Sequence, residues 1–200
     1  MEKLIEAINR DNLVDIKKIC KSGVDLNSNV KIGMEYDLDS YDEIPILFYA
    51  IRSGASLEAI ELLVENGADI FITDSDGVGA IDIAIKFKRD DVVKFCIDKG
   101  IDINSTKRKS GITPLLLASC FNNIDIIELL IENGADINAT DKSGMGAKDY
   151  ARKLGQKRVV EFLEKQGAKF NIYQNENIKK EKESLKNRKK PTQDMGFDKI

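Results

Sequence analysis

The chain has 200 residues, with 31 Lys or Arg against 34 Asp or Glu and a formal net charge of −3, which argues against a nucleic-acid partner. It contains no histidine, so the commonest general base and the commonest metal ligand are both missing. The cysteines Cys20, Cys96 and Cys120 lack metal-ligand spacing and suit a reducing compartment. The start has no signal-peptide apolar segment, and no apolar run reaches membrane-spanning length. We therefore expect a cytoplasmic monomer without membrane contact.

The N-terminal stretch, residues 1–27, predicts two short helices. Apolar residues follow helical spacing from Leu4 to Ile8 and from Leu13 to Cys20, and Asp11-Asn12 interrupts the pattern. Charged residues separate the apolar positions. Such a composition is typical of a terminal unit, because the outer face of the end of a stack meets water.

Residues 29–43, NVKIGMEYDLDSYDE, form an acidic segment that is also partly apolar. A loop that only meets water has no need of Met34, Tyr36, Leu38 and Tyr41. We predict an inserted loop here. Its apolar residues either fold back onto the rest of the chain as a plug or present Tyr36 and Tyr41 to a partner.

The rest of the chain up to residue 172 repeats one pattern about every 33 residues. In the clearest copy, Thr113-Pro114 opens a short apolar helix, because proline suits the first helical position. Asn122-Asn123 breaks that helix. The next helix is apolar over most of its circumference, which predicts burial on several sides, and it ends at Asn133-Gly134. The glycines that end the second helices recur at 67, 100, 134 and 167.

This period, with its Gly-Ala-Asp turns and its Thr-Pro motif, resembles the ankyrin repeat. The resemblance covers residues 1–173, with units at about 1–27, 44–72, 73–106, 107–140 and 141–172. It implies an all-α fold, an α-helical repeat solenoid of helix-turn-helix units with short β-hairpin tips. The histidine of the family's Thr-Pro-Leu-His motif ties neighbouring repeats together. Here Asp82, Leu116 and Asp149 stand in its place.

The resemblance also implies a non-catalytic protein that binds another protein through a concave face made of first helices and hairpin tips. Aromatic and Arg side chains are frequent anchors of such interfaces. We expect Phe87 and Phe121 to lie one above the other along this face, either exposed to a partner or packed between adjacent helices. Carried over residue by residue, the face contains Ile51, Arg52, Val78, Lys86, Phe87, Ile112, Phe121, Met145, Lys153 and Leu154.

An alternative function is that of an inhibitor or immunity-like protein, which would block a partner's active site with the acidic loop 29–43. Nothing in the sequence indicates an enzyme, a cofactor or a metal site. Phosphate-binding loops, dinucleotide fingerprints and paired cysteines are missing, and a stack of helix pairs forms an open groove rather than a closed pocket. A calcium loop aligned on Gly77 would begin at Ile72 and end at Ile83, neither of which is a ligand.

Residues 174–200 form a charged C-terminal tail, with eight Lys or Arg against five Asp or Glu. The tail has too few apolar residues to bury a core, so we expect a solvated helical extension or disorder. The basic run at 186–190, KNRKK, is also compatible with a nuclear signal or a phosphate-binding patch.

Overall fold

The computed structural model describes residues 1–32 and 42–172, in which the helices come in pairs. The predictions for residues 33–41 and for the tail from 173 onwards lie outside these ranges. The first helices of the pairs are α1 (Glu2–Asn9), α3 (Ile46–Ser53), α5 (Ala80–Lys86), α7 (Pro114–Cys120) and α9 (Ala147–Lys153). The second helices are α2 (Leu13–Cys20), α4 (Leu57–Glu65), α6 (Asp90–Asp98), α8 (Ile124–Glu132) and α10 (Lys157–Lys165). We number the pairs as repeats one to five.

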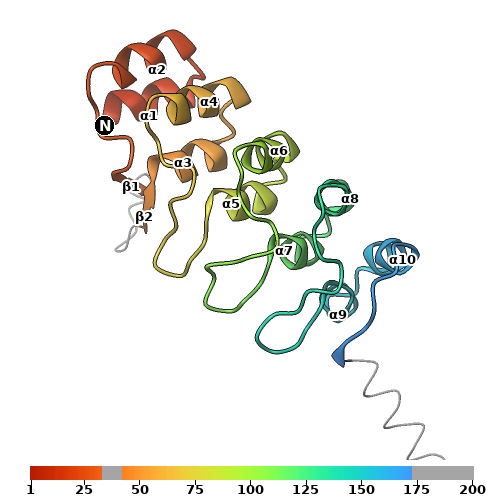
Figure 1. Cartoon of the computed structure of the whole chain (residues 1–200). Helices are drawn as coiled ribbons and strands as arrows, with labels where there is room; N and C mark the ends of the chain where they lie inside the picture. Colours follow the sequence, from red (N-terminus) through yellow and green to blue (C-terminus); the bar gives the residue numbers. More distant parts are fainter. Residues whose placement is uncertain (33–41, 173–200) are drawn as a thin grey trace, which may run out of the picture.

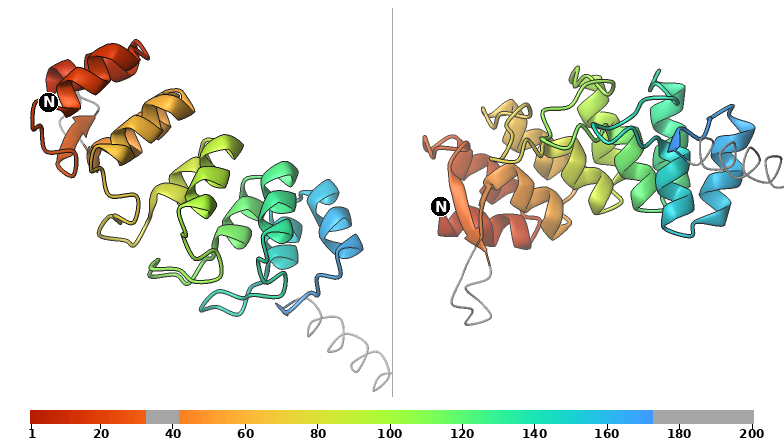
Figure 2. Two further views of the ribbon diagram at one scale, coloured as in Figure 1. Left: turned by 45° about the horizontal axis from the view of Figure 1, so that its top comes forward. Right: turned by 90° about the horizontal axis from the view of Figure 1, so that it is seen from below.

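The pairs stack side by side into an elongated, curved array (Figure 1). First helices make one row and second helices make the other, and α3, α5, α7 and α9 pack against one another in turn. The long loops between repeats project from one side of the stack, at the end away from the turns within the pairs (Figure 2). This is the helical repeat solenoid that the sequence predicts.

Local signals set the helix ends as expected. Helix α7 begins at Pro114 after the N-cap residue Thr113. Helix α8 is capped by Asn123, whose side chain accepts the Ile126 N–H at 3.2 Å. It ends at Asn133, and Gly134 follows with φ of 88°, a left-handed conformation that glycine adopts without strain.

A single apolar core runs the length of the array between the two rows of helices. Leu63, Ile85, Leu130 and Leu163, from repeats two to five, are all fully buried and belong to one cluster. Each repeat therefore buries its apolar surface on its neighbours, and stability arises mainly at the interfaces between repeats.

The prediction of a plain loop over residues 29–43 is wrong at both ends of the segment. Strand β1 (Asn29–Ile32) pairs antiparallel with β2 (Asp42–Pro45), with Val30 opposite Ile44. Val30 is buried and Lys31 is exposed, which is the alternation of a strand with one covered face. The two strands form a ribbon that contacts α3. The loops of repeats three and five show the expected short hairpin contact as single bridges, Thr73 to Gly79 and Thr140 to Gly146.

Within residues 1–32 and 42–172, no helix combines the length and the apolar character needed to cross a bilayer.

Candidate partner-binding surface

Three predicted contact residues occupy the same place in successive repeats. Phe87, Phe121 and Leu154 are the C-cap residues of α5, α7 and α9. Because α5 packs on α7 and α7 packs on α9, the three positions form a row across repeats three to five. Residues about 33 positions apart in the sequence thus occupy equivalent positions at the ends of the first helices.

The residues of this row differ in exposure. Phe87 is 37% exposed and Leu154 is 52% exposed, whereas Phe121 is partly buried and packs against the core. The expectation that Ile51 is exposed beside them is wrong, since Ile51 is 1% exposed. Helix α3 extends to Ser53 and ends at Gly54, so Ile51 still lies within the helix and on its core side.

Positive charge surrounds Phe87. The Arg52 guanidinium carbon lies 6.0 Å from the centroid of the Phe87 ring, and Lys86 Nζ lies 5.9 Å from it. Both cations are at cation–π range and remain exposed to solvent. Lys153 is exposed next to Leu154 in the fifth repeat. We call these five residues, Arg52, Lys86, Phe87, Lys153 and Leu154, the cationic face.

The predicted hairpin contacts are less uniform. Val78 and Ile112 are half-buried and retain some surface. Met145 is 9% exposed just before α9, so it has almost no surface left for a partner, and we omit it from the face. Tyr36 and Tyr41 fall within residues 33–41, outside the described ranges.

Carboxylates take over the inter-repeat contact that the family's histidine makes. Asp82 Oδ2 accepts the Gly79 N–H at 2.8 Å, and its Oδ1 lies 3.2 Å from Arg108 Nη1 of the next hairpin. Asp82 is buried, and this burial raises the pKa of its carboxyl group, with the Gly79 N–H and Arg108 acting in the opposite direction. The hairpin that carries Arg108 is one residue longer than the hairpin of the fifth repeat, which is the sequence signal that could have indicated the contact.

In the fifth repeat, a buried carboxylate likewise accepts backbone N–H groups. Asp149 is fully buried, and its Oδ2 accepts N–H groups from Gly146 and Asn171, both at 3.0 Å. The Phe170 ring beside Asn171 lies 4.3 Å from Lys148 Nζ and 5.2 Å from the Arg152 guanidinium carbon. Residues 170–172 are therefore held against α9.

The three cysteines are free thiols, of which Cys20 and Cys96 are buried. Burial raises the pKa of the Cys96 thiol to about 12 and that of Cys120 to about 11, and it also raises the pKa of Cys20. Burial therefore disfavours the thiolate, the form that reacts or binds metal, at all three cysteines. The described residues contain no cluster of three or more metal-binding side chains.

Comparison with known proteins agrees with this geometry. Residues 4–107 and 82–174 match the family model of ankyrin repeats (three copies). The chain is 33% identical over 96 residues to FPV245 and 29% identical over 104 residues to FPV244, both named as ankyrin repeat proteins of Fowlpox virus (strain NVSL). These matches cover 48% and 52% of this chain but only 21% and 14% of the two viral proteins, so the chain spans about a fifth of their length or less.

Ankyrin repeats generally mediate protein–protein interactions, and the family is generally non-catalytic. The two family matches together extend over most of the chain, from the first helix pair to the last. The chain belongs to the ankyrin repeat family.

Proposed function

We propose that the chain binds a partner protein through the cationic face and performs no catalytic step of its own. The observation that carries the proposal is the exposed Phe87 ring between Arg52 and Lys86. Aromatic rings and arginines are the side chains that most often anchor protein interfaces. A ring that is already buried has no area left to give a partner, and Phe87 retains that area.

The chemistry of the face indicates a partner segment that is both acidic and apolar. Arg52, Lys86 and Lys153 offer positive charge to carboxylates, while Phe87 and Leu154 offer apolar surface. Complementary charge of this kind increases the association rate and selects among partners more than it adds affinity. The half-buried hairpin residues Val78 and Ile112 offer a partner further apolar surface.

The test compares substitutions on the face with a matched substitution away from it. A partner is captured on the immobilised full chain, and its affinity for each variant is then measured by calorimetry. Phe87→Ala should weaken binding about 10-fold or more, the scale of an interface hot spot. Lys86→Glu should slow association, whereas Lys94→Glu on α6 makes the same charge change at an exposed site on a second helix and should not.

Whether Phe121 belongs to the contact surface is tested by measuring both the stability and the partner affinity of the same variant. Because Phe121 packs against the core, Phe121→Ala should lower the free energy of unfolding more than Phe87→Ala does, yet by less than the roughly 3–5 kcal/mol of a fully buried Phe. Loss of stability with unchanged affinity would remove Phe121 from the contact surface and leave Phe87 as its centre.

The second candidate function is inhibition through the inserted segment, and the β1–β2 ribbon favours it by giving the segment a paired base. Ile32 and Asp42 are register partners, so residues 33–41 can be replaced by an Asn-Gly turn that closes the ribbon. If the cationic face is the contact, this replacement should leave affinity unchanged. Loss of binding while the β1–β2 ribbon stays folded would show that the inserted segment, and not the cationic face, contacts the partner.

A further inference from the structure

Two asparagines that lie two residues after the aspartate of a Gly-X-Asp turn, Asn27 and Asn104, each make a bidentate contact with the next repeat. Asn27 Nδ2 donates to the Gly67 carbonyl at 3.1 Å, and its Oδ1 accepts the Asp69 N–H at 2.7 Å. Asn104 makes the same pair of bonds to Gly134 and Asp136, at 2.8 and 2.7 Å. A primary carboxamide thus fits the carbonyl of the turn glycine and the N–H two residues later.

Asn138 makes part of the same contact, since its Oδ1 accepts the Lys169 N–H at 3.2 Å. In the second repeat, however, the position is occupied by Phe71, whose side chain is 51% exposed and contains no hydrogen-bonding group. The groups that an asparagine here would bind are the Gly100 carbonyl and the Asp102 N–H. Within the part of the chain that the structure describes, no side chain bonds either of them.

Gly100 and Asp102, the residues that carry these two groups, line an open pocket of about 280 Å³. Phe71 also lines this pocket, together with Ile101. Its surface is mainly apolar, with contributions from Ile72, Ile81 and Pro114. The residues that line the pocket therefore combine a backbone donor and acceptor with apolar side chains, and the half-exposed Phe71 is among them.

We propose that this pocket, which we call the amide socket, binds the primary carboxamide of an Asn or Gln side chain of the partner protein. The proposal rests on the proposed protein-binding function and names the group that is recognised. A carboxylate has no donor for the Gly100 carbonyl, and an ammonium group has no acceptor for the Asp102 N–H. A trans backbone amide has its N–H and C=O on opposite sides, so one peptide unit cannot make both bonds.

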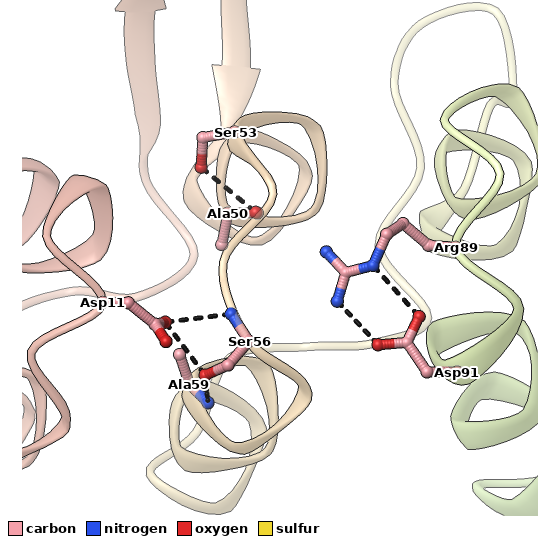
Figure 3. Close-up of polar contacts among 7 residues, drawn as sticks. All are labelled: Asp11, Ala50, Ser53, Ser56, Ala59, Arg89 and Asp91. Carbon is pink, nitrogen blue, oxygen red and sulfur yellow. Dashed lines mark hydrogen bonds and ion pairs between the residues drawn. The ribbon is translucent and has the colours of Figure 1, made fainter.

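The amide socket lies at the boundary between repeats two and three. In the described part of the chain, no hydrogen bond joins residues 44–72 to residues 73–106. Figure 3 shows the contrast: Asp11 of the first repeat accepts from the Ser56 N–H and hydroxyl at 2.9 Å, across a repeat boundary, whereas Arg89, the N-cap residue of α6, donates to Asp91 of the same repeat. A bound carboxamide would contact Phe71 on one side of this junction and residues 100–102 on the other.

The direct test uses the full chain labelled with ¹⁵N and propionamide as the probe. The backbone amide signal of Asp102 should shift saturably with propionamide. N,N-dimethylpropionamide lacks the donor and propionate carries a charge in place of it, so both should leave this signal in place. Equal shifts with the dimethyl compound, or no shift with propionamide, would overturn the proposal.

Variants of the chain provide the matched controls. Phe71→Asn should fill the socket from within, abolish the response to propionamide and slow hydrogen exchange at the Asp102 amide about 10-fold or more. Phe71→Ala should keep the response, because it leaves the backbone pair open. Asn104→Ala should create a second responsive amide at Asp136, which reports the socket geometry even if Phe71→Asn proves unstable. Persistence of the propionamide response in folded Phe71→Asn would contradict the assignment.

Partner measurements separate this inference from the function on which it rests. Phe71→Asn should weaken partner binding about 10-fold, and Phe71→Ala should weaken it less. Partner affinity that changes with Phe87→Ala but not with Phe71→Asn would overturn the amide socket and leave the cationic face standing. Partner affinity that changes with neither variant would overturn the proposed function itself. A shift of the Asp102 signal with protein concentration alone would assign the socket to a second copy of the chain and overturn the partner assignment.

Discussion

Arg108 lies 3.2 Å from the buried Asp82 carboxylate and joins the hairpin before the fourth repeat to the first helix of the third. Asp82 stands where the family has its histidine, so an ion pair replaces the usual hydrogen bond between repeats. The pair is mostly shielded from solvent, with 21% of the Arg108 side chain and 8% of the Asp82 side chain exposed. Such a pair matters chiefly because removing one partner leaves the other buried and unpaired.

Arg108→Ala should therefore lower the free energy of unfolding by about 1–3 kcal/mol, the penalty of a buried polar group that loses its partner. The double variant Arg108→Ala, Asp82→Asn should recover part of this loss, because the amide carries no charge and still accepts the Gly79 N–H. Urea unfolding of the two single variants, the double variant and the parent measures the coupling. Strictly additive losses would show that the pair has no stabilising interaction.

Leu130→Ala should lower the free energy of unfolding by about 2–5 kcal/mol. Leu130 is fully buried in α8, with repeats packed on both sides, and its truncation leaves a cavity that the neighbouring repeats cannot fill. Val14→Ala on α2 provides the control, since Val14 is 77% exposed and its loss should change stability very little. A loss below about 0.5 kcal/mol for Leu130→Ala would contradict its place in the core.

The stability of the last hairpin should depend on pH through Asp141. Burial acts to raise the pKa of Asp141, but hydrogen bonds from the Tyr150 hydroxyl, the Ser143 hydroxyl and the N–H groups of Met145 and Ser143 outweigh it, so the pKa lies below 3.8. A carboxyl group with a lowered pKa in the folded state contributes stability that is present above 3.8 and is lost as the pH falls through the folded-state pKa.

Asp141→Asn should accordingly lose less stability than the parent chain between pH 5 and pH 3, as measured by urea unfolding at each pH. Tyr150→Phe keeps the carboxyl group but removes a donor at 2.5 Å, so the pKa of Asp141 should rise toward 3.8 and the acid-sensitive contribution should shrink. An identical pH dependence in all three proteins would contradict this role of Asp141.

Deletion of residues 174–200 should leave the melting temperature nearly unchanged, because that sequence has too little apolar surface to stabilise the array. Deletion from residue 169 onwards should lower it clearly. The longer deletion removes the Asn171 N–H from the buried Asp149 carboxylate and the Phe170 ring from Lys148 and Arg152. A comparable drop for both deletions in thermal unfolding would assign a capping role to the tail itself.

The local parts of this fold could be predicted from the sequence because their causes are local. Pro114 at the start of α7 and Gly134 after α8 each depend on the preferences of one residue. The same holds for the turn carboxylates. Asp69 and Asp136, for example, accept N–H groups two residues later at 2.8 and 2.9 Å. The buried state of Leu130 follows from the apolar circumference of its helix.

The parts that depend on a neighbouring repeat could not be predicted in this way. The ion pair between Asp82 and Arg108 joins residues in different repeats, so no local pattern in either repeat indicates it. Ile51 and Met145 were expected on the surface from their places in the repeat, but both are buried. Ile51 lies six residues after the N-cap of α3, the same place that the buried Ile85 has in α5. The β1–β2 ribbon was missed because the alternation of Val30 and Lys31 is too short to be distinctive.

The uneven distribution of hydrogen bonds along the array has a mechanical consequence. Repeats one and two are joined by the bonds of Asn27 and Asp11, and repeats three to five by those of Asn104, Asn138 and Arg108. Between these two groups, within the described residues, α3 and α5 are held by apolar packing and by the contact of Arg52 with the Phe87 ring, without a hydrogen bond. We therefore expect the array to be stiffer within each group than between them. A partner that changes the curvature of the array should act first at this boundary, where the Arg52 guanidinium lies over the Phe87 ring.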